Sequence, residues 1–381
     1  MLLLHTSDWH VGRTFHGRSL LADQEAVLLG LADMVRERQV DVVLVAGDLY
    51  DRAVPSPEAV QVVTRGLEAI RGAGATVVVT SGNHDSAARL GAFTSFLAAG
   101  GLHLRTSLTR VAEPVLLEDE HGPVAVYPLP YLEPEIARQA WNLTGPPSHQ
   151  AAMDHAMAQV RADLAGRSGV RSVVLAHAFV TGATAGGSER SIAVGGVESV
   201  GADAFDGIDF VALGHLHGAQ AVRETVRYSG SPLAYSFGER HQRKSVSLVE
   251  LSADGRVTVE IAPLPVPRAL AVVRGSLEEI LCGYDELREH YLSVELTDKV
   301  RPLEPMRKLQ QVFPHTLTIA WDPVEVAVPR AHRAPSAGAL SGDDDLIEQF
   351  LAECRGDRAS AAERALIGGA LAAQRRGEMT G

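Results

Sequence analysis

Five short apolar segments, each followed at once by polar residues of metal-binding type, constrain this chain more than any other feature. The segments are residues 2–4, 40–46, 76–80, 172–176 and 208–213. They lack the polar alternation of half-exposed strands, which predicts strands buried on both faces. Helical patterns at about 20–38 and 56–71 separate the first three segments. Because strands alternate with helices, the sequence predicts a layered α/β domain.

The polar residues that follow these segments are carboxylates, imidazoles and one amide. They are Asp8, His10, Asp48, Asn83, His84, His177, His215 and His217. Ligands of open α/β sheets bind outside the carboxyl ends of the strands, so we expect these side chains in one crevice. Residues two apart in an extended segment, such as Asp8 and His10, face the same way and can reach ions together. Glycines before Asp48, Asn83 and His215 are expected to let the backbone turn tightly out of the sheet.

Each of these motifs is weak by itself. Gly47-Asp48 is a common turn, and an isolated His177 says almost nothing about function. Five such motifs in this order, each at the end of a predicted strand, are together a strong signal. Asp85 has two open interpretations, as a group that orients its neighbours or as a carboxylate that stabilises a turn.

The five motifs resemble those of the calcineurin-like metallophosphoesterase superfamily. Further segments at 5–12, 127–132, 188–196 and 228–232 are similar to the nuclease subunits of bacterial SbcCD complexes within that superfamily. The resemblance extends over about residues 1–265. It continues less closely into a small following domain and is thin over the tail.

The resemblance implies two metal ions bridged by Asp48. The other implied ligands form two sets, one for each ion: Asp8, His10 and His217, and Asn83, His177 and His215. His84 would contact the scissile phosphate and assist departure of the leaving group. Some relatives carry a further histidine shortly after the bridging aspartate. Because Asp51 and Arg52 stand there in this chain, that role is not assigned.

The donor types and the charge of the chain bear on metal and substrate. Carboxylate, imidazole and amide donors without thiolate favour manganese, iron or zinc, and the resemblance favours Mn(II). The net charge of −12 argues against a broad basic surface that coats nucleic acid, whereas bound ions would attract phosphate locally. Arg13, Arg18 and Arg89 are candidates for contacts with DNA phosphates, with solvated surface arginines as the alternative.

Four segments are predicted along the chain. Residues 1–265 form the metallophosphoesterase nuclease domain, and 268–325 form a small α+β capping or DNA-contact domain with a β-α-β-α-β pattern. Residues 326–342, rich in Pro, Ala, Gly and Ser, form a linker. The helical segment 343–381, with a capping box at Ser360 and Glu363, either docks a partner or folds back on the parent domain.

The resemblance implies a metal-dependent DNA nuclease with double-strand 3'-to-5' exonuclease and single-strand or hairpin endonuclease activity. It further implies a homodimer that joins an SbcC-type coiled-coil ATPase in a heterotetramer for DNA repair, recombination and replication. A metallophosphoesterase of cyclic nucleotides or phosphomonoesters is the enzymatic alternative. A non-catalytic scaffold would lack a ligand residue, and none is missing. No membrane span or signal peptide is expected, and two cysteines fit a cytoplasmic location.

Overall fold

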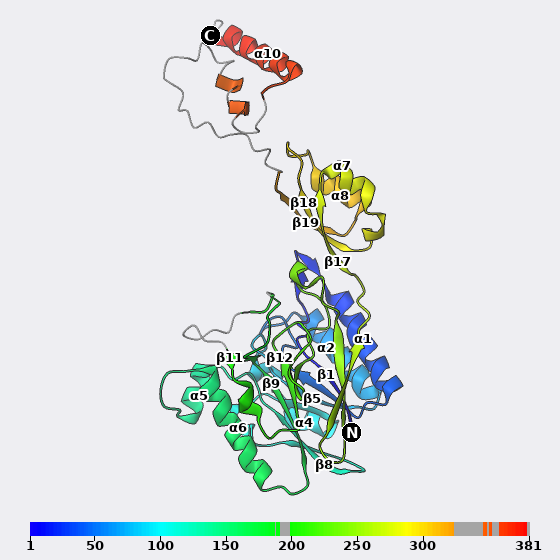
Figure 1. Ribbon diagram of the computed structural model, residues 1–381, viewed down its shortest axis with the longest axis vertical. Coiled ribbons are helices and arrows are strands. Elements are labelled where there is room, and N and C mark those ends of the chain that lie inside the picture. The colour runs from blue at the N-terminus through cyan, green and yellow to red at the C-terminus, as the bar shows by residue number, and fades with distance from the viewer. Residues whose placement is uncertain (187, 191–198, 324–345, 349, 353–357, 379–381) are drawn as a thin grey trace. The chain divides into compact units, whose positions relative to one another are not determined.

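A computed structural model describes the chain except for residues 187, 191–198, 324–345, 349, 353–357 and 379–381, and except for the side chains of 374–378. The chain divides into two compact units, Met1–Leu270 and Ala271–Gly381 (Figure 1). The predicted linker at 326–342 lies outside the described residues. Among the described helices, none combines the length and the apolar character that crossing a membrane requires.

The first unit contains two six-stranded sheets. The first sheet has the order β16 (Val257–Pro263), β15 (Ser245–Leu251), β1 (Leu2–Thr6), β4 (Val42–Ala46), β5 (Thr76–Thr80), β6 (Leu102–Arg105). The second sheet has the order β13 (Gln220–Arg223), β14 (Val226–Tyr228), β12 (Phe210–Gly214), β9 (Arg171–His177), β8 (Gly122–Pro128), β7 (Val115–Asp119).

All five predicted strands are confirmed, and they divide between the two sheets. β1, β4 and β5 are neighbours and parallel in the first sheet, whereas β9 and β12 are neighbours and parallel in the second. Their registers align the strand ends, with Ala46 opposite Thr80 and Gly214 opposite His177. The carboxyl ends of two parallel groups of strands therefore supply the predicted ligands.

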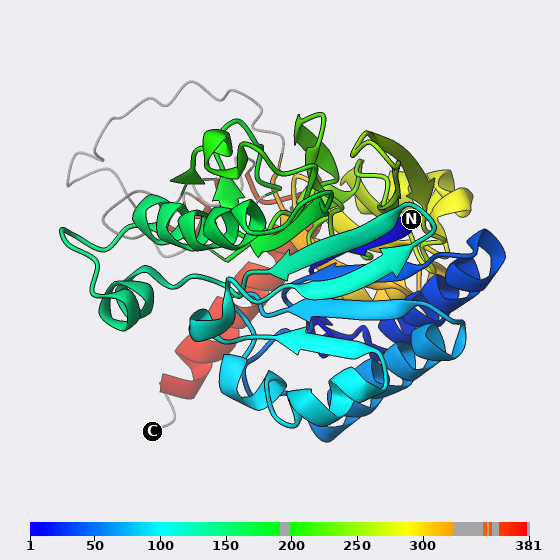
Figure 2. The ribbon, with the colours of Figure 1, turned by 90° about the horizontal axis from the view of Figure 1, so that it is seen from below.

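Helices cover the outer faces of the two sheets (Figure 2). The longer helices are α1 (Leu21–Arg38), α2 (Pro57–Gly72), α5 (Pro134–Trp141) and α6 (His149–Ala165). α2 packs on β5, and it begins where the hydroxyl of Ser56 accepts a hydrogen bond from the backbone N–H of Ala59. Side chains of α6 pack on β8, β9 and β12.

The core between the two sheets is apolar and closely packed. It includes Leu44 and Val78 from the first sheet and Leu175, Phe210 and Val126 from the second, all fully buried. Because both faces of the central strands are buried, their sequences are continuous apolar runs.

Shorter elements connect these strands and helices. They are β2 (Thr14–Phe15), β3 (Arg18–Ser19), α3 (Ala87–Leu90), α4 (Thr94–Ala99), β10 (Phe179–Val180), β11 (Ser199–Val200), and the 3₁₀ turns η1 (Leu108–Arg110), η2 (Ala202–Phe205) and η3 (Phe237–Glu239).

The second unit has the predicted β-α-β-α-β order. Its elements are β17 (Leu270–Gly275), α7 (Leu277–Gly283), η4 (Asp285–Leu287), β18 (Tyr291–Leu296), α8 (Pro305–Val312) and β19 (Thr316–Trp321), followed by α10 (Ala361–Glu378). β18 lies between β17 and β19. Ile280 of α7, Leu309 of α8 and Phe313, which follows α8, pack with Leu292 and Val294 of β18 in a small apolar core.

The tail shows the predicted capping box. The backbone N–H of Ser360 donates to Glu363 Oε2 at 2.7 Å, and the N–H of Glu363 donates to Ser360 Oγ at 3.3 Å. Residues 346–348 and 350–352 are helical, while Cys354 lies outside the described residues. Leu366 on α10 is 75% exposed, so this apolar side chain lacks a covering surface in the described part of the chain.

We predict that Gly214→Ala lowers the free energy of unfolding by about 1–3 kcal/mol, the usual effect of overpacking. A Cβ at Gly214 would lie 1.8 Å from the carbonyl oxygen of Ala46, where β12 of one sheet meets β4 of the other. Gly30→Ala in α1 is the control, because a Cβ there meets open space and should stabilise the helix by about 0.5–1 kcal/mol. Urea denaturation measures both changes, and equal stability of Gly214→Ala and the wild type would contradict the prediction.

Candidate metal centre

Four of the predicted ligands at the strand ends have a positive φ, in the left-handed region of backbone conformation. Asp8, His10 and Asp48 have φ angles of 54°, 43° and 53°, and His215 has a φ of 105°. Such conformations cost of order 1–3 kcal/mol each, and they persist when the surrounding contacts fix them. Four strained residues in one site therefore indicate a backbone shaped for function.

Backbone hydrogen bonds join the ligand loops that follow β1 and β4. The N–H of Asp8 donates to the carbonyl of Gly47 at 3.1 Å, and the N–H of His10 donates to the carbonyl of Asp48 at 2.9 Å. The buried amide of Gln24 in α1 completes this support by donating to the carbonyl of His10 at 2.8 Å. The loop that follows β1 is thus held by the loop that follows β4 and by a side chain of α1.

Asp85 joins the loops that follow β4 and β5. Its carboxylate accepts hydrogen bonds from the backbone N–H groups of Leu49, Tyr50 and Gly82 at 3.2, 3.1 and 3.0 Å. Burial and the nearby charge of Asp48 raise the pKa of Asp85 to about 7. Both interpretations of Asp85 apply, because it stabilises a turn and thereby fixes the neighbouring ligands.

The three glycines that precede ligands serve two different purposes. Gly47 has a positive φ of 86°, in agreement with the predicted tight turn. Gly82 and Gly214 have no positive φ, and what their positions require is the space that a missing side chain leaves. A Cβ at Gly82 would lie 2.1 Å from Asp48 Oδ1, and one at Gly214 would meet the first sheet.

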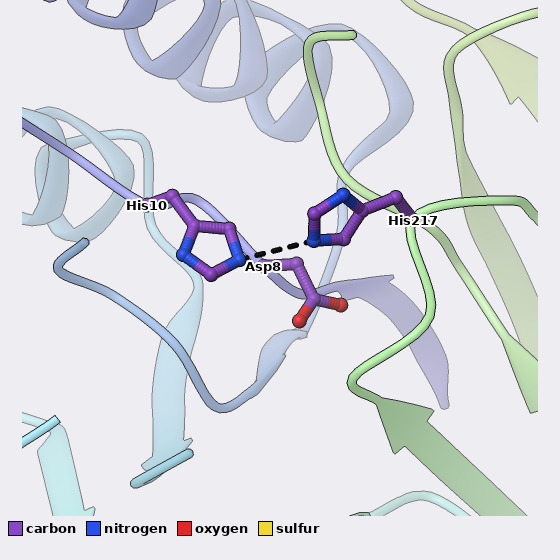
Figure 3. A group of neighbouring side chains, drawn as sticks. All are labelled: Asp8, His10 and His217. Atoms are coloured by element: carbon purple, nitrogen blue, oxygen red, sulfur yellow. Dashed lines mark hydrogen bonds between the residues drawn. The ribbon is translucent and has the colours of Figure 1, made fainter. Parts of the chain in front are cut away.

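Asp8, His10 and His217 form one group of donors (Figure 3). All three are buried, and their donor atoms lie within 4.8 Å of one another. The Nε2 atoms of His10 and His217 are 3.1 Å apart. This group has the same members as the first predicted ligand set, although its ligand role stays a prediction.

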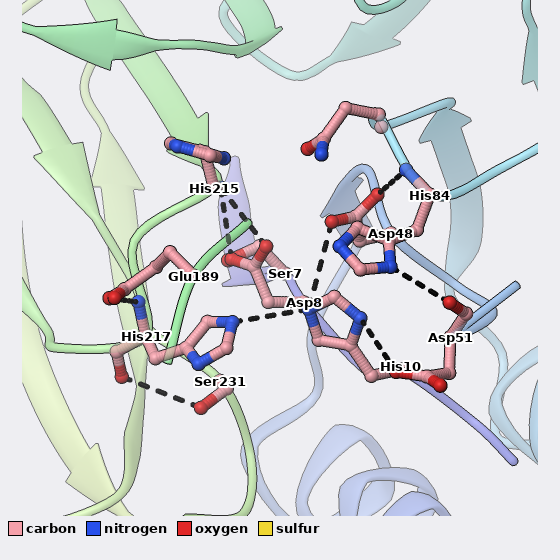
Figure 4. A network of polar contacts seen from close by, with 12 residues as sticks. Ser7, Asp8, His10, Asp48, Asp51, His84, Glu189, His215, His217 and Ser231 are labelled. Carbon is pink, nitrogen blue, oxygen red and sulfur yellow. Dashed lines mark hydrogen bonds and ion pairs between the residues drawn. The ribbon is translucent and has the colours of Figure 1, made fainter. Parts of the chain in front are cut away.

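Asp48 lies beside His10 and His84 (Figure 4), and its carboxylate also approaches a member of the second set. Its Oδ2 atom is 3.6 Å from His10 Nε2 and 3.4 Å from His177 Nε2. Asn83 Oδ1 lies 2.9 Å from the same nitrogen of His177. The other nitrogen of His177 faces the carbonyl of Ala46 at 2.9 Å, which fixes the orientation of the ring.

His215 stands slightly apart from these donors. Its backbone N–H donates to both carboxylate oxygens of Asp8, at 3.0 and 3.1 Å, and its ring centroid is 5.4 Å from that of His177. Among the described residues, no group of donors within 4.8 Å includes His215. Its assignment as a ligand stays a prediction.

His84 lies next to Asp48. Its backbone N–H donates to Asp48 Oδ1 at 2.8 Å, and its Nδ1 faces the carbonyl of Asp51 at 2.8 Å. A further group of close donors unites His10, Asp48 and His84. The role of His84 as a catalytic residue outside the ligand set therefore stays a prediction.

Of the candidate arginines, Arg13 lies at the site. Its guanidinium is 3.7 Å from Asp51 Oδ1 and 5.0 Å from the centre of the Tyr235 ring. Arg18 in β3 and Arg89 in α3 are exposed. Contacts of these arginines with DNA remain untested.

The site contains several buried ionisable side chains with shifted pKa values. Burial raises the pKa of Asp8 to about 6 and lowers the pKa of His215 to about 3. Burial also lowers the pKa of His177, but the charge of Asp48 outweighs this effect and raises it to about 9. Without ions, a protonated His177 therefore balances the carboxylate of Asp48.

The donor set fits divalent cations. It combines two buried carboxylates with imidazole nitrogens and one amide oxygen, and it contains no thiolate. Such donors suit manganese, iron and zinc. Positive ions would also balance the two carboxylates without a protonated imidazole.

Sequence reasoning missed the residues that support His217. Its Nδ1 lies 2.6 Å from Ser188 Oγ and 3.3 Å from Glu239 Oε1, and Glu239 pairs with Lys244. Burial would raise the pKa of Glu239, but hydrogen bonding from His217 and the charge of Lys244 hold it at about 2. Only the resemblance of segment 188–196 pointed to this region.

The sequence profile of the calcineurin-like phosphoesterase family matches residues 1–219. The chain belongs to this family. The predicted fold class is confirmed, and the site lies in the phosphoesterase part of the chain. Residues 266–355 match a second profile, described as the type 5 capsule protein repressor C-terminal domain.

Two curated relatives are similar to this phosphoesterase over most of their length, and both are named as the SbcD subunit of the nuclease SbcCD. The relative from Staphylococcus saprophyticus is 29% identical over 94% of this chain and 94% of its own length. The relative from Staphylococcus epidermidis is 28% identical over 84% of this chain and 85% of its own length. These relatives confirm the resemblance to SbcCD nuclease subunits within the phosphoesterase family.

Solved structures give a weaker likeness. A dimetal phosphatase from Danio rerio is 14% identical and covers 69% of this chain and 96% of its own length, with a TM-score of 0.42. A likeness at this score has no bearing on the function of this phosphoesterase.

A buried histidine beside the site makes stability depend on pH. Burial lowers the pKa of His5 to about 3, so the unfolded chain binds a proton between about pH 6.5 and 3 that the folded chain excludes. The free energy of unfolding is therefore unaffected by His5 above pH 6.5. Below that pH it falls by about 1.4 kcal/mol for each pH unit.

We predict that His5→Gln removes this dependence. The free energy of unfolding of the metal-free wild type should fall by about 2 kcal/mol more than that of the variant between pH 6.5 and 5. Urea denaturation at each pH gives the two curves, and parallel curves would contradict the prediction.

Proposed function

We propose that this chain is the metal-dependent DNA nuclease subunit of an SbcCD-type complex. Its reaction would be hydrolysis of phosphodiester bonds, as a double-strand 3'-to-5' exonuclease and a single-strand or hairpin endonuclease. The observation that carries the proposal is the position of Asp48 between two sets of buried donors in a phosphoesterase domain. The names of the two curated relatives supply the class of substrate.

The proposed centre holds two divalent ions, with Mn(II) as the metal. Asp48 would bridge them, and the remaining ligands would be Asp8, His10 and His217 for one ion and Asn83, His177 and His215 for the other. When bound, the ions supply charge neutralisation for the phosphate and a water of lowered pKa as nucleophile. Hydrogen bonds from the backbone N–H groups of His215 and His84 orient the carboxylates of Asp8 and Asp48.

His84 is proposed as the catalytic residue at the leaving group. The carbonyl of Asp51 can only accept a hydrogen bond, so Nδ1 of His84 carries the proton in both charge states of the ring. Nε2 is therefore the nitrogen that gains or loses a proton. A protonated Nε2 can donate to the departing oxygen, in the manner of a general acid.

The partners of the chain are proposed on the same grounds. The names of the relatives indicate a second subunit, SbcC, which the resemblance implies to be a coiled-coil ATPase. The tail carries exposed apolar side chains, with Phe350 62% and Leu366 75% exposed. We assign 343–381 to docking of the ATPase coiled coil, and 268–325 to capping and DNA contact. A homodimer within a heterotetramer and a cytoplasmic location complete the proposal.

The first test is cleavage of a linear duplex and a hairpin by the purified chain with Mn(II), Mg(II) or EDTA. We expect Mn(II)-dependent cleavage that Asp48→Ala lowers by more than about 100-fold, since even residues that only support ligands contribute 10–100-fold. If the isolated chain leaves DNA intact, the SbcC-type partner is added. Intact DNA under that condition, with hydrolysis of a small chromogenic diester, would favour the small-substrate alternative.

A second test separates His84 from the ligands. His84→Gln should lower kcat by about 10²–10⁴-fold, the usual contribution of a general acid, while Mn(II) affinity stays unchanged. Calorimetric titration with Mn(II) and cleavage kinetics give the two quantities. Unchanged turnover would remove His84 from catalysis, and lost affinity would make it a ligand.

A third test concerns the tail. Deletion of 343–381 should abolish association with the ATPase while Mn(II) binding persists, because the donors all lie in the first unit. Leu366→Asp should weaken association in the full chain, whereas Ala362→Asp on the same helix serves as the charge-matched control. Co-purification measures the complex, and a complex retained by the deletion variant would contradict the docking assignment.

A further inference from the structure

His217 differs from His177 in the groups that face its Nδ1 atom. The Nδ1 of His177 faces a backbone carbonyl, whereas the Nδ1 of His217 faces the hydroxyl of Ser188 at 2.6 Å and the carboxylate of Glu239 at 3.3 Å. Its Nε2 lies toward His10 and Asp8 (Figure 3). The two nitrogens therefore face two different environments, one made of candidate ligands and one containing a buried anion.

The anion belongs to an ion pair that is sealed from solvent. Glu239 is 0% and Lys244 is 3% exposed, and their carboxylate and ammonium groups are 2.6 Å apart. The ammonium of Lys244 also donates to the carbonyl of His217 at 2.9 Å and to Ser231 Oγ at 3.0 Å. The pair thus contacts both the side chain and the backbone of one candidate ligand.

The hydrogen bonds of this cluster have one consistent direction. The carboxylate of Glu239 can only accept, so the Ser188 hydroxyl donates to it and accepts from Nδ1–H of His217. A proton fixed on Nδ1 leaves the lone pair of the neutral ring on Nε2, the nitrogen beside Asp8 and His10. Metal-binding histidines commonly have a carboxylate in this position, which sets the tautomer and raises basicity.

A purely structural explanation of the ion pair is weak. Desolvation of two charges costs several kcal/mol, and apolar replacements of buried pairs are often neutral or stabilising. A second partly buried pair, Arg171 with Asp119, lies at the start of β9, the strand that ends at His177, and Asp119 also pairs with the amino group of Met1. It offers a matched comparison at the end of the strand remote from the site.

We propose that the Glu239–Lys244 ion pair, acting through Ser188, orients the His217 imidazole toward the metal centre. Glu239 is then a positioning residue for one of the two ions. This inference rests on the proposed function, because it assumes that His217 binds an ion. It goes beyond the ligand set by naming the group that makes one ligand competent.

The test measures Mn(II) affinity by calorimetry and by the electron paramagnetic resonance signal of free Mn(II). The double variant Glu239→Gln with Lys244→Met removes both charges together, so no uncompensated charge is buried. It should weaken one of two Mn(II) sites by about 10–100-fold and leave the other unchanged. Ser188→Ala should cause a smaller loss of Mn(II) affinity, since Glu239 can still accept a hydrogen bond from Nδ1 of His217. This single variant replaces the double variant in the test if the double variant does not fold.

The control is Arg171→Met with Asp119→Asn, which removes the remote pair and should leave both Mn(II) sites unchanged. Thermal unfolding of each metal-free variant reports the structural contribution separately. Wild-type affinities in both the double variant and Ser188→Ala, or equal losses in the control, would overturn the positioning role alone. A wild-type chain that binds no divalent ion would overturn the proposed function as well.

Discussion

The close approach of the two sheets at the carboxyl ends of their parallel strands is the constraint on which the site depends. The carbonyl of Ala46 in one sheet lies so near Gly214 in the other that any Cβ would overlap it. Within the first sheet, the loop after β5 is equally crowded, since the backbone of Gly82 lies against the carboxylate of Asp48. The absence of two side chains therefore allows donors from both sheets to occupy one small volume.

This arrangement concentrates charge and backbone strain in the interior of the protein. Four of the predicted ligands hold a positive φ, and several imidazoles and two carboxylates lie buried together. These features cost stability, which the apolar core between the sheets offsets. Gln24 and Asp85 contribute rigidity, because their side chains form hydrogen bonds with the backbones of the loops that carry the predicted ligands.

The strands and the candidate ligands could be predicted from local sequence patterns. The apolar runs indicated the strands because both faces are buried, and the residues after each run indicated candidate ligands. The division of the strands between two sheets could not be predicted, since periodicity does not report which strands pair. Nor could the pairing of Glu239 with Lys244, because single charged residues in a sequence carry no sign of burial. The purpose of Gly82 and Gly214 likewise depends on atoms from distant segments.

The site joins residues that are far apart along the chain, as the contact between His10 and His217 spans 207 positions. Closing such a loop costs conformational entropy, and proteins rich in contacts of this kind fold slowly. The donors come from both ends of the phosphoesterase domain. A nascent or partly folded chain therefore holds only a fraction of the centre, and hydrolytic capacity arises only when the two sheets have docked. The hydrolytic site of this phosphoesterase is therefore a property of the complete domain and of no local segment.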